Sequence, residues 1–420
     1  MAATSKLPAV PAIAPSSALA PLREPLFRSL WIAAVISYTG TWMQNVGAGW
    51  LMTQLNPDPF LVSMVLTAAT LPVFLVMLPA GAIADMMDRR RLLLFAQWWM
   101  VLASGTLGVL TLLHHVSPVG LLLFTFLLGL GAVMNDPAWQ AITPEVVSRP
   151  NHAAAVALNS AGFNVARAVG PALAGIVITM ASSGSAFLLN ALSFFGVIVV
   201  LYRWKRPPAP PVQSPGIMES ILEGLRYVGR SPNVQSVLVR TGVFSLAATA
   251  IWALMPLLAQ PFGPTGFGML VGSFGVGALA GAVILPKLRP HLPLDGLVAA
   301  AISVLALVTF SSGRLHDLAS LCLVMFIGGT AWIGILASLN FAAQTMAPTW
   351  VRARSLSMYL LVLQGGMAIG SAIWGAVATR LGVPNALAAA ALALIVGLGA
   401  IPRHRLTFRE LESAPAVVRD

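Results

Sequence analysis

The sequence predicts an all-α membrane protein whose twelve transmembrane helices form two pseudo-symmetric six-helix bundles, with both termini in the cytoplasm. Three observations support this prediction: the composition, a series of long apolar runs and an internal repeat. Of 420 residues, 58% are hydrophobic and 9% are charged, whereas a soluble domain typically carries about 25% charged residues. Too few polar side chains are present to cover a water-facing surface. The composition therefore excludes an ordinary soluble enzyme, and the single cysteine, Cys322, excludes a disulfide scaffold.

The apolar runs are long enough to cross a bilayer, which requires about 20 apolar residues per helix. Twelve of them occur between charged and turn-forming segments. They cover residues 29–53, 60–84, 92–114, 117–136, 153–180, 184–203, 234–260, 264–286, 294–312, 317–341, 355–379 and 383–401.

The positive charges predict the orientation of these helices. When the N-terminus is placed in the cytoplasm, all but four of the 24 Lys and Arg residues fall on the cytoplasmic side or in the tails. Arg314 and Arg380 face outside, and Arg167 and Arg240 lie within spans. Cytoplasmic loops of membrane proteins carry such an excess of Lys and Arg. The net charge of +11 therefore indicates topology and a lipid bilayer as surroundings, not a nucleic-acid partner.

An internal repeat relates the two halves of the chain. At an offset of 200 residues, glycines and one arginine of the first half coincide with identical residues of the second half. The coinciding pairs are Gly81 and Gly281, Arg89 and Arg289, Gly170 and Gly370, and Gly175 and Gly375. A parallel repeat of six helices is the arrangement of a major facilitator transporter.

The repeat and the apolar runs divide the chain into five parts. A disordered cytoplasmic tail (1–28) precedes the first bundle (29–203), and the second bundle (234–402) precedes a C-terminal cytoplasmic tail (403–420). The linker between the bundles (204–233) contains apolar residues at helical spacing within Ile217–Arg230. This pattern predicts an amphipathic helix on the membrane face, acting as a strut or as a binding site for a partner.

A glycine and an acidic residue precede a basic cluster after the second span: Gly81, Asp85, Arg89, Arg90 and Arg91. The pattern resembles the signature between spans 2 and 3 of the major facilitator superfamily. The resemblance implies a conformational latch, in which Asp85 accepts charge-assisted hydrogen bonds in one conformer. The three arginines also serve as anchors on the cytoplasmic side. Met87 and Asp88 depart from the family pattern, which usually has a glycine here.

The fifth span contains Gly170, Pro171 and Gly175, a spacing that resembles the signature of the antiporter branch of the superfamily. The glycines allow close helix contact and the proline bends a helix, although generic membrane packing also accounts for them. Arg167 lies about 21 Å along this span, given a rise of 1.5 Å per residue. An arginine at that depth requires a partner or a wet cavity.

Asn164 and Asn159 precede Arg167 by one and two helical turns. Together they predict a polar face that binds substrate or couples ions, with structural pairing inside the bundle as the alternative. Aromatic and amide side chains elsewhere suit a medium-sized, partly apolar ligand, and each of them also suits packing or an interfacial belt. These candidates are Tyr38, Trp42, Asn45, Trp252, Trp332, Tyr359 and Gln364.

Several kinds of chemistry have no sequence support. The chain lacks a phosphate-binding loop of the Gly-x4-Gly-Lys-Ser/Thr type, and its six histidines lie near span ends without assembling a metal cluster. We therefore expect neither an enzyme nor a cofactor. No Asp or Glu lies clearly in the middle of a predicted span, since Asp85, Asp136, Asp295 and Asp317 fall at span ends. Proton coupling consequently depends on the family resemblance.

That resemblance extends over residues 25–405. The segment from Asn135 to Val147, with Pro137, Gln140 and Pro144, resembles a bacterial exporter group that includes the enterobactin exporter and the transmembrane secretion effectors. It implies a monomeric secondary transporter that exports drug-like or siderophore-like molecules across the bacterial cytoplasmic membrane by alternating access, with protons as the coupling ion. The alternatives are an importer or lipid flippase of the same fold, and a membrane scaffold or sensor that transports nothing.

Overall fold

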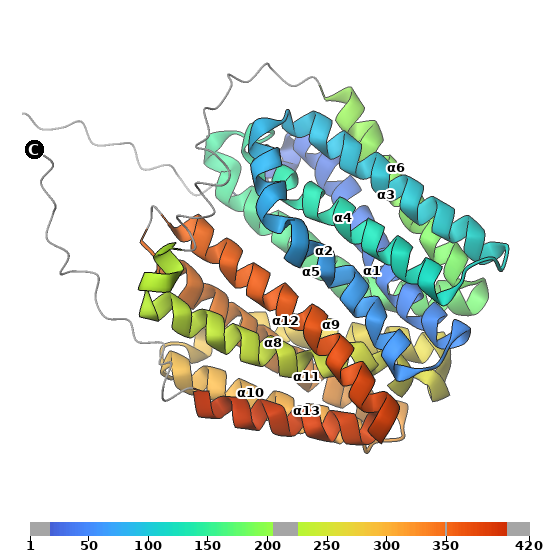
Figure 1. Ribbon diagram of the computed structural model, residues 1–420. Coiled ribbons are helices and arrows are strands. Elements are labelled where there is room, and N and C mark those ends of the chain that lie inside the picture. Colours follow the sequence, from blue (N-terminus) through green and yellow to red (C-terminus); the bar gives the residue numbers. More distant parts are fainter. Residues whose placement is uncertain (1–16, 205–225, 349–350, 401–420) are drawn as a thin grey trace, which may run out of the picture.

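The computed structural model describes residues 17–204, 226–348 and 351–400 (Figure 1). Within these ranges, the side chains of residues 78–86, 353 and 400 are not described. Residues 1–16, the predicted C-terminal tail and most of the predicted amphipathic helix at Ile217–Arg230 lie outside the described residues. The rest of the predicted N-terminal tail is not disordered, because a short helix covers Ala20–Arg23 and α1 begins at Pro25. Within the described residues, the chain is almost entirely helical.

The first half of the chain forms six long helices. Asp88, Ser117 and Ser182 cap three of them by accepting a backbone hydrogen bond from the first turn, which satisfies an N–H group that the helix leaves unpaired. The helices are α1 (Pro25–Leu55), α2 (Pro59–Met86), α3 (Arg89–Leu112), α4 (Pro118–Ile142), α5 (His152–Met180) and α6 (Ser183–Arg203).

The second half forms six more. They are α8 (Pro232–Leu258), α9 (Gly263–Leu288), α10 (Leu294–Ser312), α11 (Leu318–Thr345), α12 (Arg352–Leu381) and α13 (Val383–Gly397). Each predicted apolar run lies on one of the twelve described helices, with ends that differ by a few residues. Pro264, at the start of α9, and Pro384, at the start of α13, occupy first-turn positions where a missing N–H costs nothing.

The surface of the described helices is that of a membrane protein. Large apolar side chains are exposed along α3, α6, α10 and α13, for example Leu102 (65% exposed), Leu192 (65%), Leu307 (66%) and Leu392 (63%). Such a surface is unsuited to water. Nine described segments are long and apolar enough to cross a membrane, and one of them, Pro232–Leu288, contains both α8 and α9. Helix α1 is outside this set, and α13 counts as a shorter apolar helix.

The packing pattern of the first six helices recurs in the last six. Helix α1 packs against α5 and α6, as α8 packs against α12 and α13. Helix α4 packs against α2 and α3, as α11 packs against α9 and α10. The two groups meet along α5–α9 and α2–α12, and Figure 1 shows α12 lying beside α2 at this junction. These two contacts are equivalent under the repeat, because α9 corresponds to α2 and α12 to α5.

The repeated glycines have equivalent neighbours. Gly170 faces α1 and Gly370 faces α8, whereas Gly175 faces the start of α9 and Gly375 faces the start of α2. A Cβ atom added at Gly175 would lie 2.9 Å from backbone atoms of Pro264 and Thr265. Small residues allow two membrane helices to approach closely, so the offset of 200 residues marks positions where helix backbones touch.

Candidate functional site

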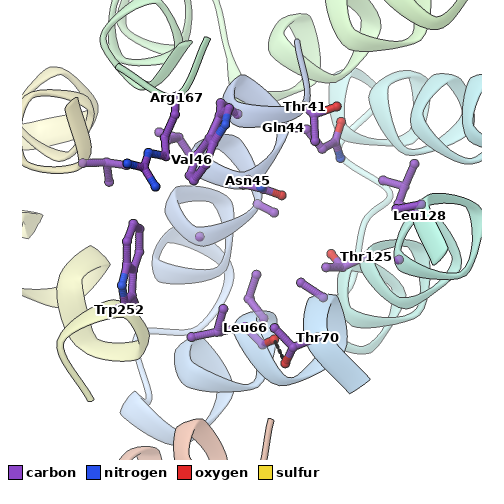
Figure 2. A pocket seen from close by; sticks show the side chains of 18 of the residues that line it. Thr41, Gln44, Asn45, Val46, Leu66, Thr70, Thr125, Leu128, Arg167 and Trp252 are labelled. Carbon is purple, nitrogen blue, oxygen red and sulfur yellow. Dashed lines mark hydrogen bonds between the residues drawn. The ribbon is translucent and has the colours of Figure 1, made fainter. Parts of the chain in front are cut away.

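A cavity of about 600 Å³ lies between the two groups of helices (Figure 2). Its lining comes from α1–α6 of the first half and from α8, α9, α11 and α12 of the second. The volume is typical of sites that bind drug-sized ligands. Peripheral helices α10 and α13 contribute none of the lining side chains.

The two halves are in contact at one end of this cavity. Trp50 of α1 and Phe267 of α9 have ring centroids 6.5 Å apart. Two hydroxyl contacts reinforce this end. Thr379 Oγ1 donates to Asp58 Oδ1 at 2.6 Å, and the hydroxyls of Thr179 and Thr265 lie 2.8 Å apart. These contacts form the closed end of the cavity.

Further contacts join the halves midway along the helices. On the α2–α12 side, the hydroxyls of Thr67 and Ser371 lie 2.6 Å apart. On the α5–α9 side, Pro171 has no N–H and leaves the carbonyl of Arg167 without its usual helical partner. Gly275 of α9 lies against that carbonyl, because a Cβ atom added to it would be 2.7 Å from the Arg167 oxygen. Helix α5 continues through Pro171 to Met180.

The two walls of the cavity differ in chemistry. The first-half wall is mixed: beside apolar residues such as Val65 and Phe194 it carries most of the polar side chains, and among the described lining residues it carries both charges, Asp136 and Arg167. Its uncharged polar members are Ser37, Tyr38, Thr41, Gln44, Asn45, Thr70, Gln97, Thr125, Asn135 and Asn190. The second-half wall is aromatic and aliphatic, with Gln364 as its amide side chain; its other members are Trp252, Ala253, Met255, Pro256, Phe267, Val271, Trp332, Leu336, Leu363 and Met367. An amphipathic ligand matches this division.

The structure brings most of the predicted binding residues together on the cavity. Tyr38, Trp42, Asn45, Arg167, Trp252, Trp332 and Gln364 all line it. Trp42 and Trp252 meet across the two halves with ring centroids 6.4 Å apart, and Trp252 and Trp332 lie 6.0 Å apart in an edge-on arrangement. Aromatic pairs favour such tilted arrangements over face-to-face stacking.

Arg167 reaches from α5 towards Trp252 in Figure 2. Its Nε and Nη2 atoms are buried and have no hydrogen-bond partner among the described residues. Buried polar atoms are normally paired, and an unpaired guanidinium in a membrane is costly. No described side chain therefore pairs with these two nitrogen atoms. The Arg167 side chain borders the cavity.

Three other predicted residues lie away from the cavity lining. Asn164 donates to the carbonyl of Ser160 on its own helix at 2.8 Å. Asn159 donates to Thr143 Oγ1 at 3.3 Å. Tyr359 is buried in the core, where its hydroxyl donates to the carbonyl of Leu336 at 3.4 Å. These bonds satisfy the polar atoms locally.

The basic cluster of the predicted latch ties helices of the first half together. Arg89 donates to Glu145 Oε1 at 2.8 Å and to the carbonyl of Ala141 at 3.1 Å, at the end of α4. Arg90 Nε donates to the carbonyl of Leu201 at 2.8 Å, in the last turn of α6. Positive charge is favourable at a helix C-terminus.

The turn before α3 departs from the family pattern, but a side-chain hydrogen bond holds it in place. Asp88 Oδ1 accepts a hydrogen bond from the backbone N–H of Arg91 at 2.9 Å and so caps α3. The side chain of Asp85, and the surroundings of Gly81, lie outside the described residues. The latch therefore stays a prediction.

The structure adds residues that the sequence did not reveal. Asp136 is exposed to the cavity, although the sequence placed it at the end of a span. Pro137 is a turn signal, but α4 continues through it to Ile142 and carries Asp136 within the helix. Arg240, the other arginine within a predicted span, is 5% exposed and pairs with Asp295.

Comparisons with known proteins agree with this fold and site. A family model described as transmembrane secretion effector matches residues 16–419. The multidrug efflux pump Tap of Mycolicibacterium fortuitum is 27% identical over 94% of this chain and 99% of its own length. The enterobactin exporter EntS of Shigella boydii is 26% identical over 89% of this chain and 91% of its own length.

Solved transporters share the fold at low sequence identity. A bacterial homologue of the lysosomal transporter Spinster, in an inward-facing occupied conformation, superposes with a TM-score of 0.74 at 14% identity over 92% of this chain and 98% of its own. The nucleoside transporter NupG gives 0.74 at 12% identity over 90% of this chain and all of its own. The chain belongs to the transmembrane secretion effector family of the major facilitator superfamily, and it is a membrane transporter, not an enzyme.

Proposed function

We propose that the protein exports small organic molecules, drug-like or siderophore-like, across the bacterial cytoplasmic membrane by alternating access. The observation that carries this proposal is the cavity of about 600 Å³ between two repeat-related groups of helices, closed at one end by contacts between the groups. A cavity so placed can open to either side when the groups rock against each other.

The arginine distribution supports an orientation in the membrane. We propose that all twelve helices cross the membrane and that both termini are cytoplasmic. The contacts at Trp50 and Phe267 then close the external end, and the structure corresponds to an inward-facing state. Since one chain supplies both walls of the cavity, we take the monomer as the transporting unit.

Export is supported by the relatives. Tap is named a multidrug efflux pump and EntS an enterobactin exporter, and both align with almost the whole chain. A proton moving inwards through a membrane potential of 100 mV releases about 2.3 kcal/mol, in addition to the energy of any pH gradient. We propose that this influx drives the export step.

Everted membrane vesicles test the proposal. We expect vesicles containing the protein to accumulate ethidium when respiration acidifies their lumen, and the added dye to dissipate part of the pH gradient. An importer or a flippase would not accumulate the dye in this orientation, and a scaffold would leave both signals unchanged. Vesicles lacking the protein provide the control, and an absence of any difference between the two preparations would contradict the exporter proposal.

The predicted latch gives a separate prediction. We expect Asp85→Asn to slow turnover in these vesicles with little change in ligand binding, because a latch acts on the rate of conformational exchange and not on the cavity wall. Asp88→Asn, which keeps a capping side chain at the start of α3, is the matched control. Turnover of Asp85→Asn equal to that of the unmodified protein would remove the latch.

A further inference from the structure

We propose that Asp136 is the carboxylate that takes up and releases the coupling proton of this transporter. The inference rests on the proposed proton-coupled export and assigns one residue to it. It starts from the position of Asp136, which lies on α4, lines the cavity and is exposed to it. A carboxylate in this position exchanges protons with cavity water, and it lies on the wall that a bound ligand touches.

Among the described side chains, none of those packed around α4 is shown to pair a cation with Asp136. Helix α4 packs against α1, α2, α3 and the short helix Thr143–Glu145. On these elements, Tyr38 of α1 lies close enough to interact electrostatically with Asp136. Arg89 of α3 pairs with Glu145, and the remaining arginines of α1 and α3 lie in the first turns of those helices. The described side chains of α2 include no ionisable group.

Asn135 provides a fixed neighbour. Its side chain lies close enough to interact electrostatically with the Asp136 carboxylate, and its Oδ1 accepts a hydrogen bond from Gln97 Nε2 at 2.9 Å. Gln97 is 3% exposed, so this amide chain is held in place between α3 and α4.

The internal repeat shows that the charge is a special feature of the first half. Two hundred residues after Asp136 comes Leu336, and two hundred residues after Arg167 comes Met367. Both of these residues line the same cavity. Equivalent positions on the two walls therefore carry a carboxylate and a guanidinium on one side, and apolar side chains on the other.

Such asymmetry confines proton exchange to one wall. In the outward-facing state, the Asp136 carboxylate takes a proton from external water and becomes a neutral carboxylic acid. In the inward-facing state, the acid returns the proton to cytoplasmic water and becomes a carboxylate again. One proton crosses per cycle, and no other reactant is consumed. Protonation and deprotonation of Asp136 change the charge of the wall on which the ligand is bound. This charge change links proton movement to ligand movement.

A distance measurement that needs no ligand tests the assignment. Val156 on α5 and Val283 on α9 are 59% and 65% exposed and lie on the halves of their helices away from the closed end. Spin labels at cysteines introduced there, with Cys322→Ser, report the separation of the two halves in the full chain in lipid nanodiscs. We expect acidification to increase the share of long distances, because the protonated state returns to the inward-facing form.

Asp136→Asn, which mimics the protonated acid, is expected to show the long distances at every pH. Asp317→Asn is the matched control, because Asp317 caps α11 outside the cavity and asparagine also caps helices. The control is expected to respond to pH as the unmodified protein does. A pH response retained by Asp136→Asn would overturn the assignment, and so would an unmodified protein that does not respond to pH.

Ethidium transport in proteoliposomes adds a second measurement. Asp136→Asn is expected to lose uptake driven by a pH gradient and to keep exchange of ethidium across the membrane without a gradient. Uptake that stays gradient-driven in the variant would overturn the assignment. If the unmodified protein moves no ethidium while its pH response still depends on Asp136, the assignment stands and the exporter proposal fails for this cation.

Discussion

At the scale of single residues, Arg167 combines two separate contacts. Its carbonyl, freed by Pro171, touches Gly275 of the other half. Its guanidinium lies at the cavity, and two of its nitrogen atoms have no partner in the part of the chain that the structure describes. The backbone of this residue thus belongs to the interface between the halves, while its side chain belongs to the binding wall. A substitution of Arg167 tests the second role and leaves the first in place.

We expect Arg167→Met to lower transport by roughly ten- to a hundredfold, because a hydrogen bond to a charged group contributes about 1.5–3 kcal/mol. Methionine is the residue found at the equivalent position, Met367, so the cavity wall keeps its bulk. Arg167→Lys retains the charge and is expected to keep part of the activity. Transport by Arg167→Met at the unmodified rate in everted vesicles would exclude a ligand or coupling role.

Glu24 gives a pH prediction outside the membrane-spanning helices. Burial raises its pKa, but hydrogen bonds from Asn151 and Ser148 outweigh that effect and hold the pKa below its ordinary value of 4.5. Because the folded pKa is the lower one, the stabilising contribution is present above pH 4.5 and disappears as the pH falls through the folded pKa. Thermal unfolding at several pH values should show this acid-side loss, and Glu24→Gln should lack it.

At the scale of helices, the glycines of α9 determine how closely the two halves approach. A Cβ atom added at Gly268 would lie 2.4 Å from the carbonyl oxygen of Pro171, which is closer than any real contact. Gly275 has a similar position about two helical turns further along. These glycines therefore set the separation between α5 and α9 at the site where Arg167 enters the cavity.

We expect Gly268→Ala to lower the free energy of unfolding by about 1–3 kcal/mol through overpacking, and to favour states in which α5 and α9 separate. Gly196 on α6 is the matched control, because a Cβ atom added there meets nothing within 4 Å. Gly196→Ala should be neutral or slightly stabilising, since alanine favours a helix by up to about 1 kcal/mol over glycine. Equal melting temperatures for the two variants would contradict the close approach.

The sequence predicted the helices well and the binding wall only in part. Long apolar runs leave few alternatives to a helix in lipid, so each run lies on one observed helix. Arg167 was identified because a charge deep in a span is conspicuous. Asp136 was not singled out because the predicted span ended there, whereas α4 continues through Pro137 to Ile142. Helical spacing also does not determine which face meets the cavity, and Asn164 lies outside the cavity lining.

At the scale of the whole molecule, two symmetry-related contacts close one end of the cavity. Thr179, on α5, bonds to Thr265, and Thr379, two hundred residues later on α12, bonds to Asp58. The repeat thus places one hydroxyl contact on each interface. Breaking either contact should weaken the same closed state, because both act between the same two rigid groups.

We expect Thr379→Val to shift the population towards the state open at this end by roughly fivefold, since a hydrogen bond contributes about 1 kcal/mol net. The spin-label distance between Val156 and Val283 would shorten accordingly. Thr111→Val, which removes a hydroxyl bonded only within α3, is the control and should leave the distance unchanged. An unchanged distribution in Thr379→Val would show that this contact does not bias the equilibrium.

The equivalence of the two interfaces also bears on how such a chain can diversify. Two identical six-helix chains would close through the same pair of contacts as α5–α9 and α2–α12, in the manner of a twofold dimer. In that dimer every charge would occur twice around one axis, and two guanidiniums would face a single shared space. Joining the halves in one polypeptide removes that constraint, so that Met367 can stand opposite Arg167 and one ligand can be held in a single orientation.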